Sequence, residues 1–114
     1  MAQKLAEKHC VPCEGGVEPL KGEELDRLER ELGEAWQVVD EHHLEKEFTF
    51  DTYLEGVNFV NEVATIADEE GHHPDICVGY GKVRVTLWTH NIGGLSENDF
   101  IVAAKIEQSI RSTL

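Results

Sequence analysis

The chain has 114 residues, of which 10 are Lys or Arg and 23 are Asp or Glu, so its formal net charge is −13. This length suits one domain with one hydrophobic core, and the 40% apolar and 29% charged residues are ordinary for a folded globular protein. No apolar run approaches the roughly 20 residues that span a bilayer, and residues 1–8 lack the continuous apolar core of a secretory signal.

The acidic residues are concentrated in the middle of the chain. Between Asp40 and Asp75 lie eleven acidic residues and a single base, Lys46. Such a surface repels phosphate backbones, whose binding depends on Lys and Arg, so we expect neither nucleic-acid binding nor attachment to a membrane. Three cysteines without an export signal indicate free thiols in a reducing, cytoplasmic compartment.

Residues 1–19 are expected to form an irregular lead-in segment, and residues 20–114 a single domain. The lead-in holds residues that interrupt regular structure, namely Pro12, Gly15, Gly16 and Pro19.

The domain begins with a short amphipathic helix over residues 22–32, in which leucines recur at spacings of three and four. Gly33 ends it, because glycine takes the left-handed closing conformation without strain. Two strands are predicted next, over residues 35–39 and 44–50. The second strand is expected to place these side chains on one face: Leu44, Lys46, Phe48 and Phe50.

A long helix follows, capped by Asp51 or Thr52 and stopped at Gly71 and Pro74. Its buried stripe is predicted to be Tyr53, Val57, Val60, Ala64 and Ala67.

A hairpin over residues 76–80 and 82–89 comes next, with Val83, Val85 and Leu87 facing inward. Ser96 and Asp99 open a last helix in the manner of a capping box. The order helix, two strands, helix, two strands, helix indicates an α+β fold, with a mainly antiparallel sheet and helices on one face.

The candidate site begins at the motif GHHP over residues 71–74, at the end of the long helix. Proline restrains the turn, so the backbone sets the directions of His72 and His73. Histidine titrates near pH ~6.5, which suits proton transfer at cellular pH. His90 ends the alternating strand and Asp99 follows nine residues later. If the hairpin brings the strand end back to residue 72, these groups line one cleft.

A purely structural interpretation of the same residues remains open. Adjacent histidines in an acidic loop are often exposed turn residues, and Asp99 is explained as the capping-box acid three residues after Ser96. His90 can end its strand in solvent. The second pair, His42-His43, has neither proline nor glycine beside it, and we assign no chemistry to it.

A metal or redox site is the other alternative. Two histidines and a carboxylate can hold iron or zinc, but neighbouring residues such as His72 and His73 usually point apart. The sequence HCVPC over residues 9–13 holds a CxxC, yet a second CxxC is absent, and thioredoxin-like sites need a different setting. Cys77 falls in a predicted strand and is expected to be a small buried residue.

Taken together, these residues resemble the signature of the pterin-4a-carbinolamine dehydratases. The matching pattern is Asp68-x3-His72-His73-Pro74, Tyr80 after five residues, His90 after nine more and Asp99 after eight more. The resemblance covers about residues 20–110 and includes Trp36, Phe48-x-Phe50 and Gly94-Leu95-Ser96. The lead-in CVPCEGG over residues 10–16 is similar to the N-terminal segment of many bacterial and plant members.

The resemblance implies dehydration of 4a-hydroxytetrahydropterin to quinonoid dihydropterin and water, a step that recycles the cofactor of aromatic amino-acid hydroxylases. It implies no cofactor and no metal, since the pterin is the substrate. It also implies a four-stranded antiparallel sheet with three helices packed on one face, in a homodimer joined at sheet edges or a homotetramer joined through helices.

The resemblance also implies catalytic roles for three histidines. His72 is expected to be the main proton-transfer group, His90 its acid–base counterpart and His73 the residue that holds and orients the pterin. Asp99 is expected to orient a histidine or contact the substrate. Asp68, one helical turn before the histidines, is expected to bias their protonation by its charge.

Two neighbouring positions complete the expected site. Pro74 is expected to help orient the substrate. Many members have arginine where this chain has Asn98, so any substrate contact made by that arginine is absent here.

A non-catalytic protein-binding role on the same fold is the alternative function. An animal relative acts as a dimerisation cofactor of a homeodomain transcription factor, and some degenerate relatives serve as assembly factors. In this chain every position of the histidine pattern is filled by a chemically able residue, which favours catalysis.

Overall fold

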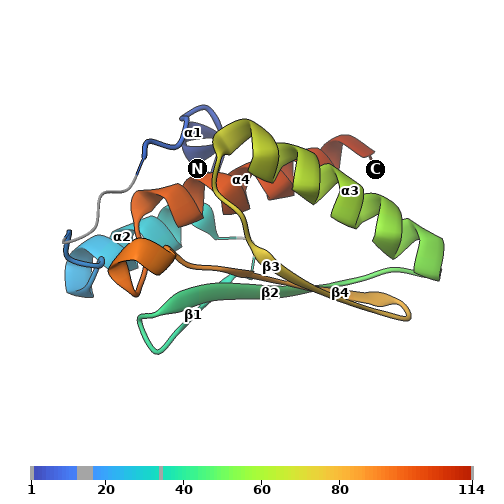
Figure 1. Cartoon of the computed structure of the whole chain (residues 1–114), viewed down its shortest axis with the longest axis horizontal. Coiled ribbons are helices and arrows are strands. Elements are labelled where there is room, and N and C mark those ends of the chain that lie inside the picture. Colours follow the sequence, from blue (N-terminus) through green and yellow to red (C-terminus); the bar gives the residue numbers. More distant parts are fainter. Residues whose placement is uncertain (1, 13–16, 34, 114) are drawn as a thin grey trace.

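The computed structural model describes residues 2–12, 17–33 and 35–113, and Figure 1 shows their path. Its helices are α1 (Ala2–Ala6), α2 (Gly22–Leu32), α3 (Tyr53–Glu70) and α4 (Glu97–Thr113). Its strands are β1 (Gln37–Val39), β2 (His43–Thr49), β3 (Asp75–Gly79) and β4 (Lys82–Leu87), and a 3-10 turn, η1 (His90–Ile92), precedes α4. Cys13, Gly15 and Gly16 of the expected lead-in segment lie outside the described residues.

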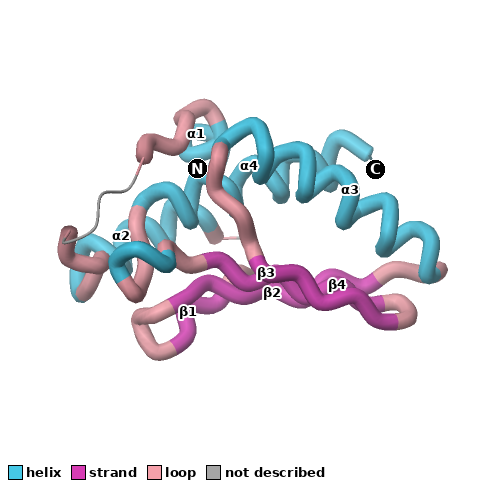
Figure 2. The backbone as a smooth tube through the Cα atoms, in the orientation of Figure 1, coloured by secondary structure: helices cyan, strands magenta, loops and turns pink. Residues whose placement is uncertain are grey.

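The strands form one antiparallel sheet of four strands in the order β1-β2-β4-β3. Figure 2 shows the helices gathered on one face of this sheet. The α+β class is therefore confirmed, with the three long helices α2, α3 and α4 covering the sheet and α1 added as a fourth, short helix.

The inward face of β4 lies at the centre of the core. Val83, Val85 and Leu87 are fully buried, as their alternation with polar residues predicts. Leu44 of β2 pairs with Leu87 and is buried with it. The two central strands, β2 and β4, thus bury these inward-facing side chains in the core. The chain then continues directly from β4 into the segment that carries His90.

The face that the long helix α3 presents to the core is shifted from the predicted stripe, of which Ala67 is buried and Val60 packs against the core. The structure buries Gly56, Phe59, Val63 and Ala67, whereas Tyr53 and Ala64 are exposed. Phe59 sets this orientation, because its ring packs against the rings of Phe48 in β2 and Phe50 just after it. The ring centroids lie 4.6 and 5.3 Å from that of Phe59. A Cβ at Gly56 would lie 3.3 Å from Val83 Cγ2, so glycine there lets the helix approach β4 closely.

The N-terminal segment is more ordered than expected. Residues 2–6 form α1, and Leu5 is buried in the main core, so an irregular lead-in over residues 1–19 is wrong for its first turn. Lys105 of α4 donates a hydrogen bond to the Ala6 carbonyl oxygen at 2.7 Å. One helical turn is too short to show a repeating apolar pattern, which is why the sequence did not reveal it.

Candidate active site

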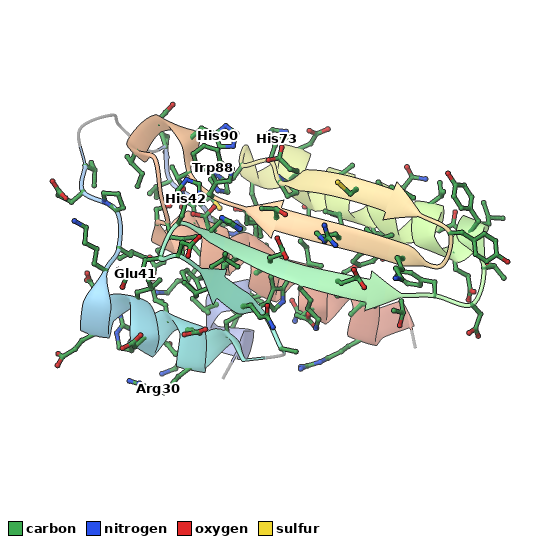
Figure 3. The ribbon with its side chains drawn as sticks, turned by 90° about the horizontal axis from the view of Figure 1, so that it is seen from below. Arg30, Glu41, His42, His73, Trp88 and His90 are labelled. Carbon is green, nitrogen blue, oxygen red and sulfur yellow. The ribbon has the colours of Figure 1, made fainter. Side chains whose placement is uncertain are left out.

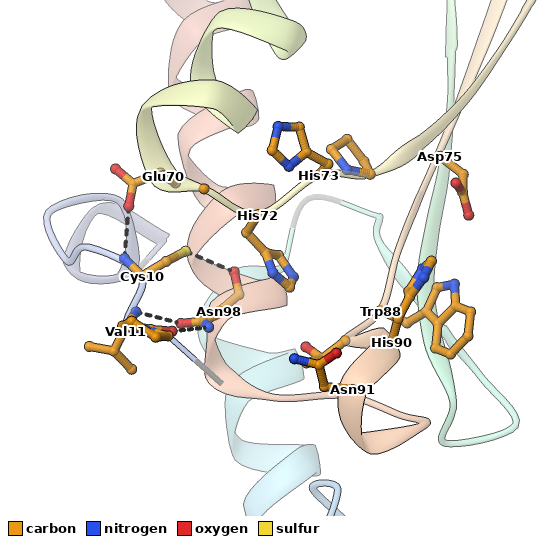
Figure 4. Close-up of a pocket in the computed structure, with 14 residues that line it drawn as sticks. Cys10, Val11, Glu70, His72, His73, Asp75, Trp88, His90, Asn91 and Asn98 are labelled. Atoms are coloured by element: carbon orange, nitrogen blue, oxygen red, sulfur yellow. Dashed lines mark hydrogen bonds between the residues drawn. The ribbon is translucent and has the colours of Figure 1, made fainter. Parts of the chain in front are cut away.

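A cavity of about 590 Å³ lies beside the end of β4 and is lined by residues 10–12, 70–75, 88–91 and Asn98 (Figure 4). This volume lies within the ~300–1,000 Å³ range of small-molecule sites. The lining residues come from the N-terminal segment, the α3–β3 connection, the end of β4 and the first turn of α4. Segments far apart in sequence therefore meet around one hollow.

The end of α3 delivers His72 and His73 to this cavity. Gly71 closes the helix in the left-handed conformation, with φ +65°, and the His72 N–H donates to the Ala67 carbonyl at 3.1 Å. Pro74 follows and also lines the cavity. The predicted helix stop therefore places both histidines at the mouth of the same hollow.

His72 is held by Asp99. Its Nε2 lies 2.6 Å from Asp99 Oδ1, and the Asp99 side chain is 0% exposed while that of His72 is 13% exposed. The other carboxylate oxygen, Oδ2, accepts hydrogen bonds from the Thr89 hydroxyl at 2.8 Å and from the Ser96 N–H at 2.9 Å. With two donors on Oδ2, the Asp99 side chain is held in place, and its Oδ1 contact fixes the position of the His72 ring.

His73 makes a separate and exposed pair. Its Nε2 lies 2.9 Å from Asp68 Oδ1, with the two side chains 61% and 81% exposed. The two adjacent histidines thus take different carboxylate partners, one on α4 and one on α3. Asp68 does not line the cavity, and the structure places it against His73 rather than His72.

His90 belongs to an aromatic stack that the sequence did not reveal. Its ring lies 3.9 Å from the Trp88 ring at an angle of 29°, and the other neighbour of Trp88 is His42, 4.5 Å away. Figure 3 shows the three rings at the same end of the sheet. His42 Nδ1 lies 3.0 Å from His43 Nδ1. His42, from the pair to which we assigned no chemistry, therefore packs against the Trp88 ring beside His90.

Most of the predicted site residues meet in the cavity. His72, His73, Pro74 and His90 line it, and Asp99 lies behind His72, while Asp68 lies outside the lining. Sequence reasoning missed several lining residues, chiefly Trp88 and Glu70. The sequence offered one signal for Trp88, namely that it is an aromatic residue directly before Thr89 and His90.

The N-terminal segment contributes Cys10, whose thiol is partly buried at the edge of the cavity. Burial, together with the nearby Glu70 carboxylate, raises the pKa of the Cys10 thiol to about 12, so it is protonated at neutral pH. Its Sγ lies 3.6 Å from the Asn98 carbonyl oxygen. Cys13, the other half of the CxxC, lies outside the described residues.

Glu70 is almost buried beside this segment. It accepts hydrogen bonds from the Cys10 N–H at 2.7 Å and lies 3.1 Å from His9 Nδ1. Burial alone would raise the pKa of Glu70, but these two hydrogen bonds and the charge of Lys105, 3.5 Å away, outweigh burial and lower it. Glu70 is therefore a carboxylate at neutral pH.

Cys77 does not have the buried environment that was predicted for it. Cys77 is exposed rather than buried, because it lies on the edge strand β3 and pairs with the outward-facing Arg84. Within residues 2–12, 17–33 and 35–113, no group of three or more His, Cys, Asp and Glu side chains is arranged to hold a metal ion. None of the helices in these ranges is long and apolar enough to cross a membrane.

Fold and site together define a small α+β protein with a histidine-lined pocket at one end of an antiparallel sheet. Residues 18–109 match the family model described as pterin 4 alpha carbinolamine dehydratase. The chain therefore belongs to the pterin-4a-carbinolamine dehydratase family.

Several relatives are closely similar over almost their full length. A Rubrobacter xylanophilus protein is 56% identical over 105 residues, covering 92% of this chain and 97% of that protein. A Rickettsia canadensis protein is 49% identical over 106 residues, covering 93% of this chain and 97% of that protein. Both are provisionally named pterin-4-alpha-carbinolamine dehydratases.

Two solved structures share the fold. A transcriptional coactivator/pterin dehydratase from Brucella melitensis has a TM-score of 0.72 at 31% identity, covering 78% of this chain and 95% of its own. A pterin dehydratase-like protein identified as a RuBisCO assembly factor in the alpha-carboxysome has a TM-score of 0.56 at 25% identity, covering 68% of this chain and 90% of its own.

Proposed function

We propose that this protein dehydrates 4a-hydroxytetrahydropterin to quinonoid dihydropterin and water by histidine acid–base catalysis. The observation that carries the proposal is the buried contact between His72 Nε2 and Asp99 Oδ1, 2.6 Å long, at a cavity that His90 also lines. Family membership supplies the substrate class. The cavity volume of about 590 Å³ admits a two-ring substrate of this size.

The reaction needs one acid and one base. The bond from the 4a carbon to the hydroxyl oxygen breaks, and an acid gives that oxygen a proton so that it leaves as water. A base takes a proton from the pterin nitrogen system, and the electrons released form the new double bond. The carbinolamine nitrogen already assists the departure, so a general acid–base contribution of ~10²–10⁴ per group is sufficient.

His72 is assigned as the base. Asp99 Oδ2 accepts from two donors, the Thr89 hydroxyl and the Ser96 N–H, so we assign Asp99 as an acceptor on Oδ1 as well, with the Nε2–H of His72 as the donor. A neutral imidazole carries one N–H, which leaves Nδ1 of His72 as the nitrogen that accepts a proton. The carboxylate also stabilises the imidazolium that forms.

His90 is assigned as the acid, and His73 as a residue that holds the pterin at the rim. The Trp88 ring, 3.9 Å from His90, restrains the direction of the imidazole although His90 itself is exposed. His73 and its partner Asp68 are solvent-exposed. No step of this scheme requires a cofactor or a metal, and an aromatic amino-acid hydroxylase is the class of enzyme that would produce the substrate.

A stopped-flow absorbance assay of freshly generated 4a-hydroxytetrahydropterin tests the proposal. Wild-type protein should accelerate the decay, and a chelator should leave the acceleration unchanged. Activity lost to chelator and restored by zinc or iron would favour a metal mechanism instead. No acceleration by folded wild type would favour the non-catalytic role, since a fold neighbour is identified as a RuBisCO assembly factor.

A further inference from the structure

One side of the cavity is formed by the N-terminal segment, residues 10–12, which approaches the histidines from far away in the sequence. The residues that hold this segment lie 60 and 87 positions further along the chain. Figure 4 shows it on the side of the cavity opposite Trp88 and His90. The proposed chemistry assigns it no part.

Asn98 fastens this segment through both ends of its side-chain amide. Its Oδ1 accepts from the Val11 N–H at 3.1 Å, and its Nδ2 donates to the Val11 carbonyl oxygen at 2.7 Å. Asn98 is only 4% exposed. Such a paired amide–peptide contact fixes both the position and the direction of a backbone, and it depends on no particular side chain at Val11.

A second fastening comes from the end of α3. The Cys10 N–H donates to Glu70 Oε1 at 2.7 Å, and Lys8 Nζ lies 2.7 Å from Glu97 Oε2 at the start of α4. Upstream, Leu5 is buried in the core. Residues 10–12 are thus held by two helices of the proposed site, by α3, which ends at Glu70 just before the histidines, and by α4, which carries Asn98 and Asp99.

We propose that residues 10–12 are a fixed wall of the substrate site and that Asn98 is a positioning residue that acts through them. The inference rests on the proposed pterin function of the same cavity. Both ends of the Asn98 amide bind the Val11 backbone, so Asn98 contributes to substrate binding through the wall rather than by contacting charge on the substrate. When residues 10–12 are released from Asn98, each binding event must order them again, at a cost in binding free energy. The pair His72–Asp99 is expected to stay in place.

Two variants break the contact from opposite sides. Asn98→Ala removes both hydrogen bonds from the α4 side, and Val11→Pro removes the donated N–H from the wall side without altering α4. Each variant should raise KM for the carbinolamine by about tenfold and change kcat by less than about threefold. In the double variant the two increases in KM should not add, because both substitutions remove the same contact. Asn61→Ala, at an exposed position of α3, is the matched control.

Direct binding separates this inference from the proposed function. Unreactive 6-hydroxymethylpterin is titrated into labelled wild-type protein and followed by amide NMR. The backbone signals of Cys10 and Val11 should shift with the same dissociation constant as those of His72 and His73.

The possible results are distinct. Shifts at the histidines without shifts at Cys10 and Val11, or wild-type KM in folded Asn98→Ala, would overturn the inference while leaving the pterin function intact. A large loss of kcat in either variant at unchanged KM would also overturn it. If no signal shifts at all, the cavity does not bind pterins, and both the proposed function and the inference fail.

Discussion

His72 and Asp99 lie 27 positions apart in the chain, yet His72 Nε2 and Asp99 Oδ1 are 2.6 Å apart, with the carboxylate fully buried. The same carboxylate accepts the Ser96 N–H at the start of α4. Asp99 thus fits both roles that the sequence left open, because one of its oxygens caps the helix and the other positions His72, the proposed base.

Replacing that carboxylate by an amide should impair catalysis more than folding. Asp99→Asn keeps the shape of the side chain but replaces one carboxylate oxygen by an NH₂ group. This group would face groups that now donate hydrogen bonds to Asp99, so the His72 tautomer is no longer fixed. We expect kcat to fall roughly 10- to 100-fold, a part of the ~10²–10⁴ that a positioned acid or base contributes. The kcat–pH profile should change as well. Unchanged kcat and profile in folded protein would contradict the orienting role.

The second histidine–carboxylate pair provides the matched comparison. Asp68→Asn removes the charge next to His73, but both side chains are more than half exposed, at 81% and 61%. Surface ion pairs of this kind contribute ~0–1 kcal/mol. We expect KM to rise about two- to threefold and kcat to stay close to wild type, measured in the same assay. A kcat loss as large as that of Asp99→Asn would mean that Asp68 acts on the chemistry.

Trp88 should report on its two histidine neighbours. The rings of His90 and His42 lie 3.9 and 4.5 Å from the Trp88 ring, so both contact the indole. Trp88 fluorescence should therefore differ from wild type in His90→Gln and in His42→Gln, because each variant removes one ring from the indole. In a Trp88→Phe background neither substitution should alter the fluorescence, and a change that persists there would come from Trp36.

The cysteines should differ sharply in reactivity. Burial and Glu70 raise the pKa of Cys10 to about 12, so its thiol stays protonated until the pH approaches that value. Cys77 is exposed on β3. Iodoacetamide at pH 8 should label Cys77 within minutes and leave Cys10 unlabelled in native protein, as read by peptide mass spectrometry. Rapid labelling of Cys10 would show that the wall opens in solution.

The fold was largely predictable because its signals are local. The leucine spacing predicted α2 with the bounds that the structure shows, and the alternation in β4 predicted its buried face. The cap at Thr52 was one of two expected, and the structure forms it as a capping box with Glu55. Each of these signals lies within one element and needs no knowledge of its neighbours.

What the sequence did not predict depends on contacts between distant segments. The buried face of α3 follows Phe59, whose partners Phe48 and Phe50 lie on another element. The β1 strand starts later than expected, because Ala35 takes a left-handed φ of 64°. The wall at residues 10–12 and the stack around Trp88 depend on pairs such as Val11–Asn98, 87 positions apart, which no periodic pattern encodes.

The most direct test of the account compares wild type with His72→Ala in the stopped-flow decay of 4a-hydroxytetrahydropterin, with Asn61→Ala, at an exposed position of α3 outside the cavity lining, as control. The account predicts that wild type and the control accelerate the decay and that His72→Ala loses about a hundredfold in rate, on the scale of one acid–base group. Undiminished turnover by folded His72→Ala would contradict it.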